Sequence, residues 1–425
     1  MKQYVNRNWY KLFLLLFLFA PLSLRAEASR ELSRAEGSAP ASERNLYEIS
    51  ADAGAESAVS GLKQELELRF DAYNRLFRFD PSLLSAPLRV RVFSDKVAYD
   101  QYVMAQTGRT IPGAIYLHYN EIDRRELVIL RENPKPVADA TDQAAARDDA
   151  SMLSHQAFLQ FLRAFIPNPP SWICEGFAIY FSSLRVNTAG KAEYEENLLW
   201  LESVKALGAR LPSPQTILQA DITGNPYGDL SGNPEGVPEE FQISSWALVS
   251  FLLNSGQGYF RDLTDSIMLL SASATAAENS LAVLQRFSLW NDFDAVAKDF
   301  GAYLDSRKTY QELMDDGQKA YSQGDQMNAE LSFMTARDQR PSEYAPYYYL
   351  GLLSYEEKDY DAAEQYYQTS LDKGADAALL NYAMGINAAA AGRVKDAGVY
   401  LRKAVDLDPA RYRARVDDLL KKIGE

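Results

Sequence analysis

One short segment of the chain carries residues whose types and spacing approach those of a zinc-dependent hydrolase. Such enzymes place two histidines four residues apart on a helix, so that both imidazoles reach the same ion. A glutamate directly after the first histidine acts as general base on the metal-bound water. Here His155 supplies the first imidazole, but Gln156 stands at the base position and Leu159 at the second ligand position. The segment therefore lacks the base and one ligand of that chemistry.

A second helix is predicted after a proline-rich break, where the chain reads PSWICEGFAIY from Pro170 to Tyr180. With the segment around His155, this pattern resembles the peptidase-MA-like family of gluzincin-type proteins, whose usual form is HExxH followed by P-x-W-x-x-E-G-x-A-x-Y. The resemblance implies that His155 and Glu175 occupy metal-ligand positions. It also implies an α+β domain over residues 46–309, with a small sheet and a helical lobe.

The two substitutions remove independent requirements of hydrolysis. The carboxamide of Gln156 cannot take a proton from water at neutral pH, and Leu159 has no lone pair to give to zinc. His118 is the only other histidine, and it is either a replacement ligand or a polar residue on a half-buried strand. The sequence favours a degenerate, non-catalytic site without a cofactor. The alternative is a divergent zinc metallopeptidase that uses His155 and Glu175 with an atypical third ligand.

Each of these residues also has a structural interpretation. His155 is then a hydrogen-bonded histidine in a former cleft, and Glu175 a cap or pairing partner near a helix start. Cys174 is the single cysteine, so no intramolecular disulfide can form. Without a His and Asn arrangement in view, Cys174 is predicted to be a small buried side chain.

The elements that must position these residues follow from the apolar pattern. Apolar residues at helical intervals between Gln156 and Phe165 indicate a helix with a buried face. Strands are predicted before it at residues 46–50, 88–93, 114–119 and 126–131, and a further helix at residues 60–79.

The N-terminus has the pattern of a secretory signal peptide. Basic residues precede the apolar run Leu12–Leu24, and small residues suited to cleavage follow it. We predict a signal peptide over residues 1–28 and a flexible leader over residues 29–45. The protein is then exported, periplasmic or envelope-associated in a bacterium, with no stable membrane insertion after cleavage. An uncleaved N-terminal anchor is the alternative.

The charge balance limits the classes of partner. The formal net charge of the 425-residue chain is -14, which disfavours nucleic acid and anionic membrane surfaces because both would repel it. Hydrophobic residues make up 47% of the chain, enough material for two cores.

A second strong pattern begins at Tyr310, where the chain repeats itself every 34 residues. Small residues or proline recur in four phases: Gly317, Gly351 and Gly385; Ala329, Ala363 and Ala397; Ala336, Ser370 and Ala404; Pro341, Ala375 and Pro409. The pattern resembles tetratricopeptide repeats (TPRs). It implies an all-α solenoid with three repeats over residues 310–409 and a capping helix over residues 410–425.

The resemblance to TPRs implies a concave surface that commonly binds a peptide or another protein. Tyrosines are frequent in this region and suit such interfaces, so we predict Tyr347, Tyr348 and Tyr355 as protein-binding residues. Much of this tyrosine content is also normal repeat packing, and three repeats could instead buttress the upstream domain. The sequence therefore predicts an exported, non-catalytic scaffold with a protein or peptide partner.

Overall fold

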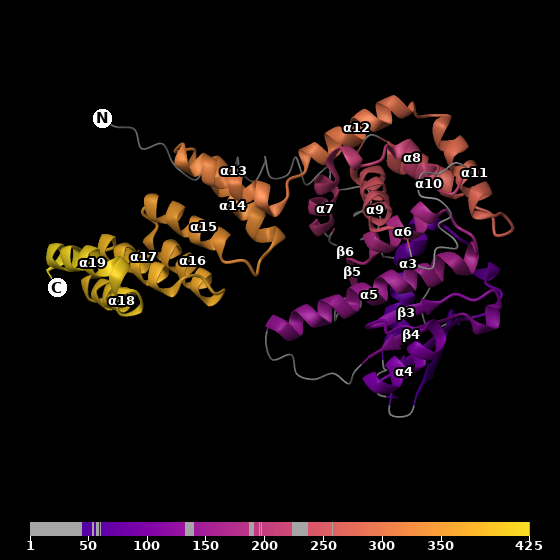
Figure 1. The fold of residues 1–425 in the computed structure, drawn as a ribbon, viewed down its shortest axis with the longest axis horizontal. Coiled ribbons are helices and arrows are strands. Elements are labelled where there is room, and N and C mark those ends of the chain that lie inside the picture. Colours follow the sequence, from indigo (N-terminus) through magenta and orange to yellow (C-terminus); the bar gives the residue numbers. More distant parts are fainter. Residues whose placement is uncertain are drawn as a thin grey trace. The chain divides into compact units, whose positions relative to one another are not determined.

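The computed structural model describes most of the chain after residue 44. The described residues are 45–52, 55, 56, 59, 61–131, 140–186, 191–194, 196, 198–222, 237–256 and 258–424. The predicted signal peptide, and the predicted leader up to residue 44, lie outside them. The chain divides into two compact units, with the boundary between Ser306 and Arg307 (Figure 1). Within the described residues, no helix combines the length and the apolar character needed to cross a membrane.

A four-stranded mixed sheet opens the N-terminal unit, and its strands lie close to the predicted ones. They are β1 (Tyr47–Ala51), β2 (Leu88–Phe93), β3 (Ala114–Leu117) and β4 (Glu126–Leu130). Their order is β1-β2-β4-β3, in which β1, β2 and β4 are parallel and β3 pairs antiparallel with β4. Strand β3 therefore forms one edge of the sheet.

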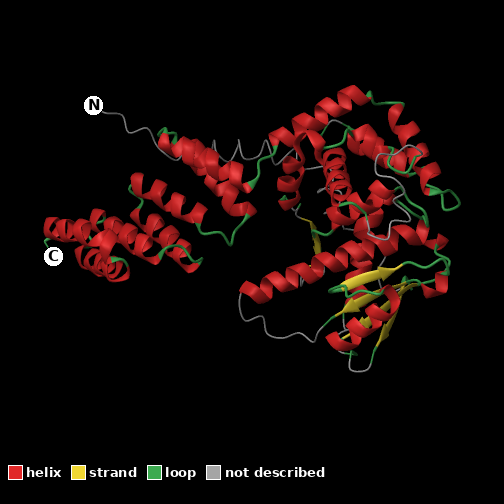
Figure 2. Ribbon diagram, viewed as in Figure 1, coloured by secondary structure: helices red, strands yellow, loops and turns green. Residues whose placement is uncertain are grey.

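Successive residues of a strand point to opposite faces, and β4 serves two cores in this way. Leu127 and Ile129 belong to the main core, which includes residues of α3 (Leu62–Phe77) and α5 (Ala140–Phe165). Val128 belongs to a smaller core with Tyr99 and Val103 of α4 (Lys96–Thr107). Helix α5 runs beside the sheet (Figure 2) and contacts β3, β4 and β2.

A helical lobe follows the sheet. Its elements are α6 (Ser171–Phe181), β5 (Leu184–Val186), β6 (Ala192–Tyr194), α7 (Leu199–Leu207), α8 (Pro214–Leu218), α9 (Glu239–Asn254), α10 (Tyr259–Ile267), α11 (Ala276–Ser288) and α12 (Phe293–Ser306). Helices α6 and α9 approach closely at Gly176, where an added Cβ would lie 2.5 Å from the carbonyl oxygen of Ser245. The glycine of the EGFAIY sequence is therefore required by packing.

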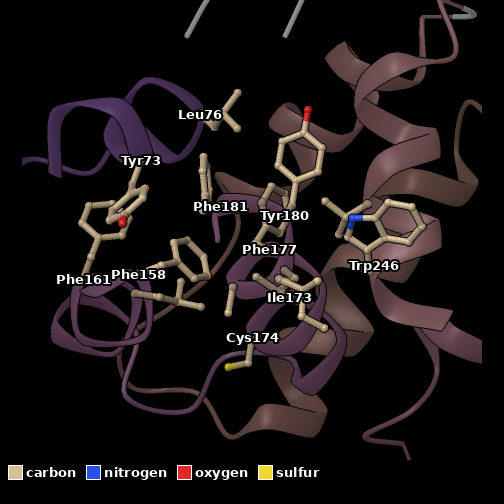
Figure 3. Packing of buried hydrophobic residues seen from close by; sticks show 14 of the residues in the cluster. Tyr73, Leu76, Phe158, Phe161, Ile173, Cys174, Phe177, Tyr180, Phe181 and Trp246 are labelled. Carbon is tan, nitrogen blue, oxygen red and sulfur yellow. The ribbon is translucent and has the colours of Figure 1, made fainter. Parts of the chain in front are cut away.

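Aromatic rings fill the space between α3, α5 and α6 (Figure 3). The ring of Phe158 stands edge-on to that of Tyr73, with centroids 5.4 Å apart, and stacks on Phe177 at 6.1 Å. Tyr73 also contacts the ring of Phe181 at 4.8 Å. Such pairs add to the free energy gained by burial alone. This core holds α5 and α6, the two helices that carry the predicted site residues, in a defined relationship.

The C-terminal unit is a series of helical hairpins. Its helices are α13 (Tyr310–Ser322), α14 (Gln326–Gln339), α15 (Ala345–Glu356), α16 (Tyr360–Asp372), α17 (Ala377–Ala390), α18 (Val394–Leu407) and α19 (Pro409–Ile423). The predicted C-terminal capping helix is α19, which begins at Pro409, one residue before the predicted start. Pro409 was predicted to end the last repeat, but it opens α19, because Asp408 caps that helix and proline suits the first helical position.

The 34-residue period has a direct packing cause. A Cβ added to Gly351 would lie 2.5 Å from the ring of Tyr367, one added to Gly317 would lie 2.6 Å from Phe333, and one added to Gly385 would lie 2.7 Å from Leu401. The three contacted residues are themselves spaced by 34. The alanines at positions 329, 363 and 397 are fully buried. Each hairpin therefore closes through the same small-residue contact, as the sequence predicted.

Candidate functional site

Helix α5 brings Gln156, at the predicted base position, against the edge of the sheet. The side-chain oxygen Oε1 of Gln156 accepts a hydrogen bond from the backbone N–H of Tyr116 on β3, at 2.9 Å. Leu159 is partly buried and packs against the main hydrophobic core. Gln156 therefore binds the strand next to α5, and Leu159 serves packing at the predicted ligand position.

Glu175 lies in the first half of α6 and is partly buried. Its Oε2 accepts a hydrogen bond from Nε2 of Gln242 on α9, at 3.1 Å. Burial raises the pKa of Glu175, while the Gln242 hydrogen bond and the positive charge of Arg163 act in the opposite direction. The structure thus pairs Glu175 with an amide of a neighbouring helix.

Arg163 also belongs to this region and was not predicted from the sequence. It follows His155 by eight residues on α5, so helical periodicity places it on the same side of the helix. Its guanidinium charge acts on Glu175 and on the thiol of Cys174, both of α6. The spacing could have identified Arg163 from the sequence, because it follows Leu159 by four residues and His155 by eight. The polar group between α5 and α6 therefore includes a permanent cation.

The two histidines lie in different surroundings. His155 is partly buried, and burial lowers its pKa to about 4, so its imidazole is neutral at pH 7. His118 lies just beyond the end of β3 and is exposed, with its Nδ1 3.3 Å from the hydroxyl of Tyr116. The prediction of a half-buried strand position for His118 was wrong, because β3 ends at Leu117.

Among the residues that the structure describes, no three His, Cys, Asp or Glu side chains gather in an arrangement that could hold a metal. One carboxylate oxygen of Glu175 already accepts a hydrogen bond from Gln242. Cys174 is buried, and burial raises the pKa of its thiol to about 12, so it is neither a ready ligand nor a ready nucleophile.

A second candidate site is the aromatic surface of α15 and α17. Tyr348, Leu352 and Tyr355 of α15, with Leu379 of α17, are partly buried and pack on one cluster of buried residues. The predicted residue Tyr347 lies elsewhere, because its hydroxyl donates to the carbonyl oxygen of Pro341 at 3.1 Å. The structure therefore places Tyr348 and Tyr355 together and separates Tyr347 from them.

A neighbouring aromatic pair connects α17 to α19 and was not predicted from the sequence. The rings of Tyr382 on α17 and Tyr412 on α19 lie 4.9 Å apart. The guanidinium of Arg411 lies 5.1 Å from the centre of the Tyr412 ring and 3.1 Å from a carboxylate oxygen of Asp376. Tyr382 follows Tyr348 by one repeat of 34 residues, and this spacing was the signal that could have identified it.

Comparisons with known proteins give a match among solved structures. No family model matches the chain, and no curated protein matches it. A similar solved structure is the first TPR of Spaghetti (RPAP3) bound to HSP90 peptide SRMEEVD. It shares 16% identity, the match covers 27% of this chain and 90% of that chain, and the TM-score is 0.26. The repeated glycine contacts within the hairpins, independently of that match, make the C-terminal unit a helical-repeat region that fits tetratricopeptide repeats.

Proposed function

We propose that this protein is an exported, non-catalytic scaffold that binds a protein or peptide through its helical repeats. The observation that carries the proposal is a set of partly buried tyrosines on consecutive repeats: Tyr348 and Tyr355 pack on one cluster of buried residues, and Tyr382 packs on the next. Partly buried tyrosines offer a large apolar area with a polar end, which suits a peptide interface.

The N-terminal unit is, in this proposal, a gluzincin-like domain that has lost hydrolysis. Two contacts support this view. Gln156 bonds the backbone of β3, and Glu175 bonds Gln242, so both positions hold structural hydrogen bonds. The divergent zinc metallopeptidase with His155, Glu175 and an atypical third ligand is the second candidate. Its main support is the intact EGFAIY sequence, but the close contact of Gly176 with α9 accounts for the glycine without catalysis.

Export is proposed from the sequence of residues 1–28, and a periplasmic or envelope location follows from it. Cell fractionation with an antibody against the C-terminal unit tests this part. Mass measurement of the mature N-terminus then separates a cleaved signal peptide from a retained anchor.

Site-specific crosslinking in the native cells tests the binding function. A photoreactive amino acid placed at Tyr348 or Tyr382 is expected to form one defined protein adduct, which mass spectrometry identifies. The matched control is the same amino acid at Leu331 of α14, which is 50% exposed and lies outside the aromatic surface. Identical adducts from all three positions, or none from Tyr348 and Tyr382, would contradict binding through this surface.

Metal analysis decides between the two candidate functions. Plasma mass spectrometry of untagged full-length protein is expected to find no stoichiometric zinc, both in the natural protein and in Glu175→Ala. Stoichiometric zinc in the natural protein that is lost in Glu175→Ala would support the metallopeptidase instead. A peptidase assay with casein would then follow.

A further inference from the structure

Charge is distributed unevenly along the C-terminal unit. Residues 310–372, which form the first two hairpins, contain four basic and thirteen acidic residues, a net charge of -9. Residues 393–422, which form α18 and α19, contain nine basic and five acidic residues, a net charge of +4. The sign of the charge therefore reverses towards the C-terminus, in a chain whose total is -14.

Helix α19 concentrates this positive charge on its exposed side. Its apolar residues, among them the buried Tyr412 and Val416, pack on α17 and α18. Its five basic residues are all exposed: Arg411, Arg413, Arg415, Lys421 and Lys422. Only Asp417 and Asp418 bring negative charge to the same helix.

Two of these five cations are held in ion pairs. Lys422 pairs with Asp418 at 2.7 Å, and Arg411 pairs with Asp376 at 3.1 Å. In the part of the chain that the structure describes, Arg413, Arg415 and Lys421 form no ion pair. The exposed side of α19 thus presents three cations that no ion pair among the described residues holds.

A terminal helix of a repeat stack needs a polar outer face for solubility, but either sign of charge would serve that purpose. Arg411 and Arg415 are four residues apart, and like charges at this spacing repel and destabilise a helix. Solubility alone therefore does not account for an excess of one sign here, in a chain that is otherwise acidic.

We propose that the exposed basic side of α19 is a docking surface for an acidic segment of a partner protein. The inference rests on the proposed binding function and adds a second contact to the aromatic surface of α15 and α17. Guanidinium groups bind carboxylates with paired, charge-assisted hydrogen bonds, which suits Arg413 and Arg415 to aspartate and glutamate side chains. A short acidic segment can reach α19 alone. A long polyanion would also meet the repulsion of the remaining acidic chain.

The test uses the full-length protein and a fluorescein-labelled poly-glutamate peptide, followed by fluorescence anisotropy at low and high salt. The natural protein is expected to bind, with affinity that falls as salt rises. The variant Arg413→Glu/Arg415→Glu/Lys421→Glu is expected to bind at least about tenfold more weakly.

The matched control is Lys63→Glu/Lys298→Glu/Lys319→Glu, which changes the net charge equally at exposed positions away from α19. It is expected to bind like the natural protein at high salt, where long-range repulsion is screened. If the α19 variant does not fold by circular dichroism, the neutral variant Arg413→Gln/Arg415→Gln/Lys421→Gln replaces it. Undiminished binding by the α19 variant, or no binding by the natural protein, would overturn the proposal.

Two further probes separate an acidic protein segment from other anions. Duplex DNA and phosphatidylglycerol vesicles are expected to bind more weakly than poly-glutamate. Tighter binding of either one would overturn the assignment to a protein partner. Crosslinking at Tyr348 reports on the aromatic surface independently. If that crosslink forms while poly-glutamate fails to bind, the α19 proposal is wrong and the proposed binding function stands.

Discussion

The side-chain oxygen of Gln156 accepts a hydrogen bond from the backbone N–H of Tyr116, with 2.9 Å between the two heavy atoms. Tyr116 lies on β3, which pairs with β4 and ends the strand order of the sheet among the described residues. The Gln156 side chain, at the predicted base position, therefore satisfies a backbone group of the edge strand β3. This relationship gives Gln156 a structural role at the edge of the sheet.

Substitution of Gln156 tests that role. Gln156→Ala removes the acceptor and is expected to lower the free energy of unfolding by about 1–2 kcal/mol, since the strand N–H loses its partner. Gln156→Glu keeps an oxygen acceptor and is expected to lose less. Urea denaturation followed by circular dichroism measures both variants. If Gln156→Ala and Gln156→Glu have the same free energy of unfolding, the hydrogen bond contributes nothing measurable to stability.

The glycine contacts of the repeats give a second prediction. In Gly351→Ala, the new methyl group would lie 2.5 Å from the ring of Tyr367, which is 2% exposed and cannot move into solvent. Overpacking of this kind costs about 1–3 kcal/mol. The melting temperature of the C-terminal unit is therefore expected to fall, as measured by differential scanning calorimetry.

Gly301→Ala is the matched control for this prediction. Gly301 lies within α12, and an added Cβ would meet no atom within 4 Å. Alanine has the higher helix propensity by about 1 kcal/mol, so this variant is expected to be equally or more stable than the natural protein. A loss of stability in Gly301→Ala as large as that in Gly351→Ala would mean that steric overlap is not the cause.

Much of the C-terminal unit could be predicted from the sequence because its contacts are local and repeated. Gly351 meets Tyr367 only 16 residues later, and a glycine meets a large side chain at the same spacing one period before and one period after it. The four strands of the N-terminal unit were also predicted within a few residues. Their order in the sheet was not predicted, because pairing between β1, β2 and β4 depends on tertiary packing.

The candidate site was predicted only in part, for the same physical reason. His155 and Glu175 could be selected by residue type and spacing. The partner of Glu175, however, is Gln242, which lies 67 residues further along the chain and meets it only because α6 packs on α9. Nothing in the local sequence around Gln242 indicates that contact.

Asp221 gives a third prediction, on the placement of α6. Pro170 stands at the N-cap of α6 and has no side chain that can cap it. Asp221 takes this role: its carboxylate accepts hydrogen bonds from the backbone N–H of Ser171 at 2.8 Å and from the hydroxyl groups of Ser171 and Ser280. Asp221→Ala is expected to lower the free energy of unfolding by about 1–2 kcal/mol. Asp221→Asn keeps an oxygen acceptor and is expected to lose less unfolding free energy than Asp221→Ala in the same urea titration. A larger loss in Asp221→Asn would assign the effect to the charge of Asp221.

Cys174 gives a fourth prediction, on chemical reactivity. Its side chain lies in the main core, and burial raises the pKa of the thiol to about 12. A raised thiol pKa favours the protonated form, and only the thiolate reacts readily with iodoacetamide. At pH 8 the folded protein is therefore expected to remain unmodified, while the protein in urea gains one adduct by mass spectrometry. Rapid modification of the folded protein would mean that α6 separates from its neighbours often enough to expose the thiol, which the tight contact at Gly176 opposes.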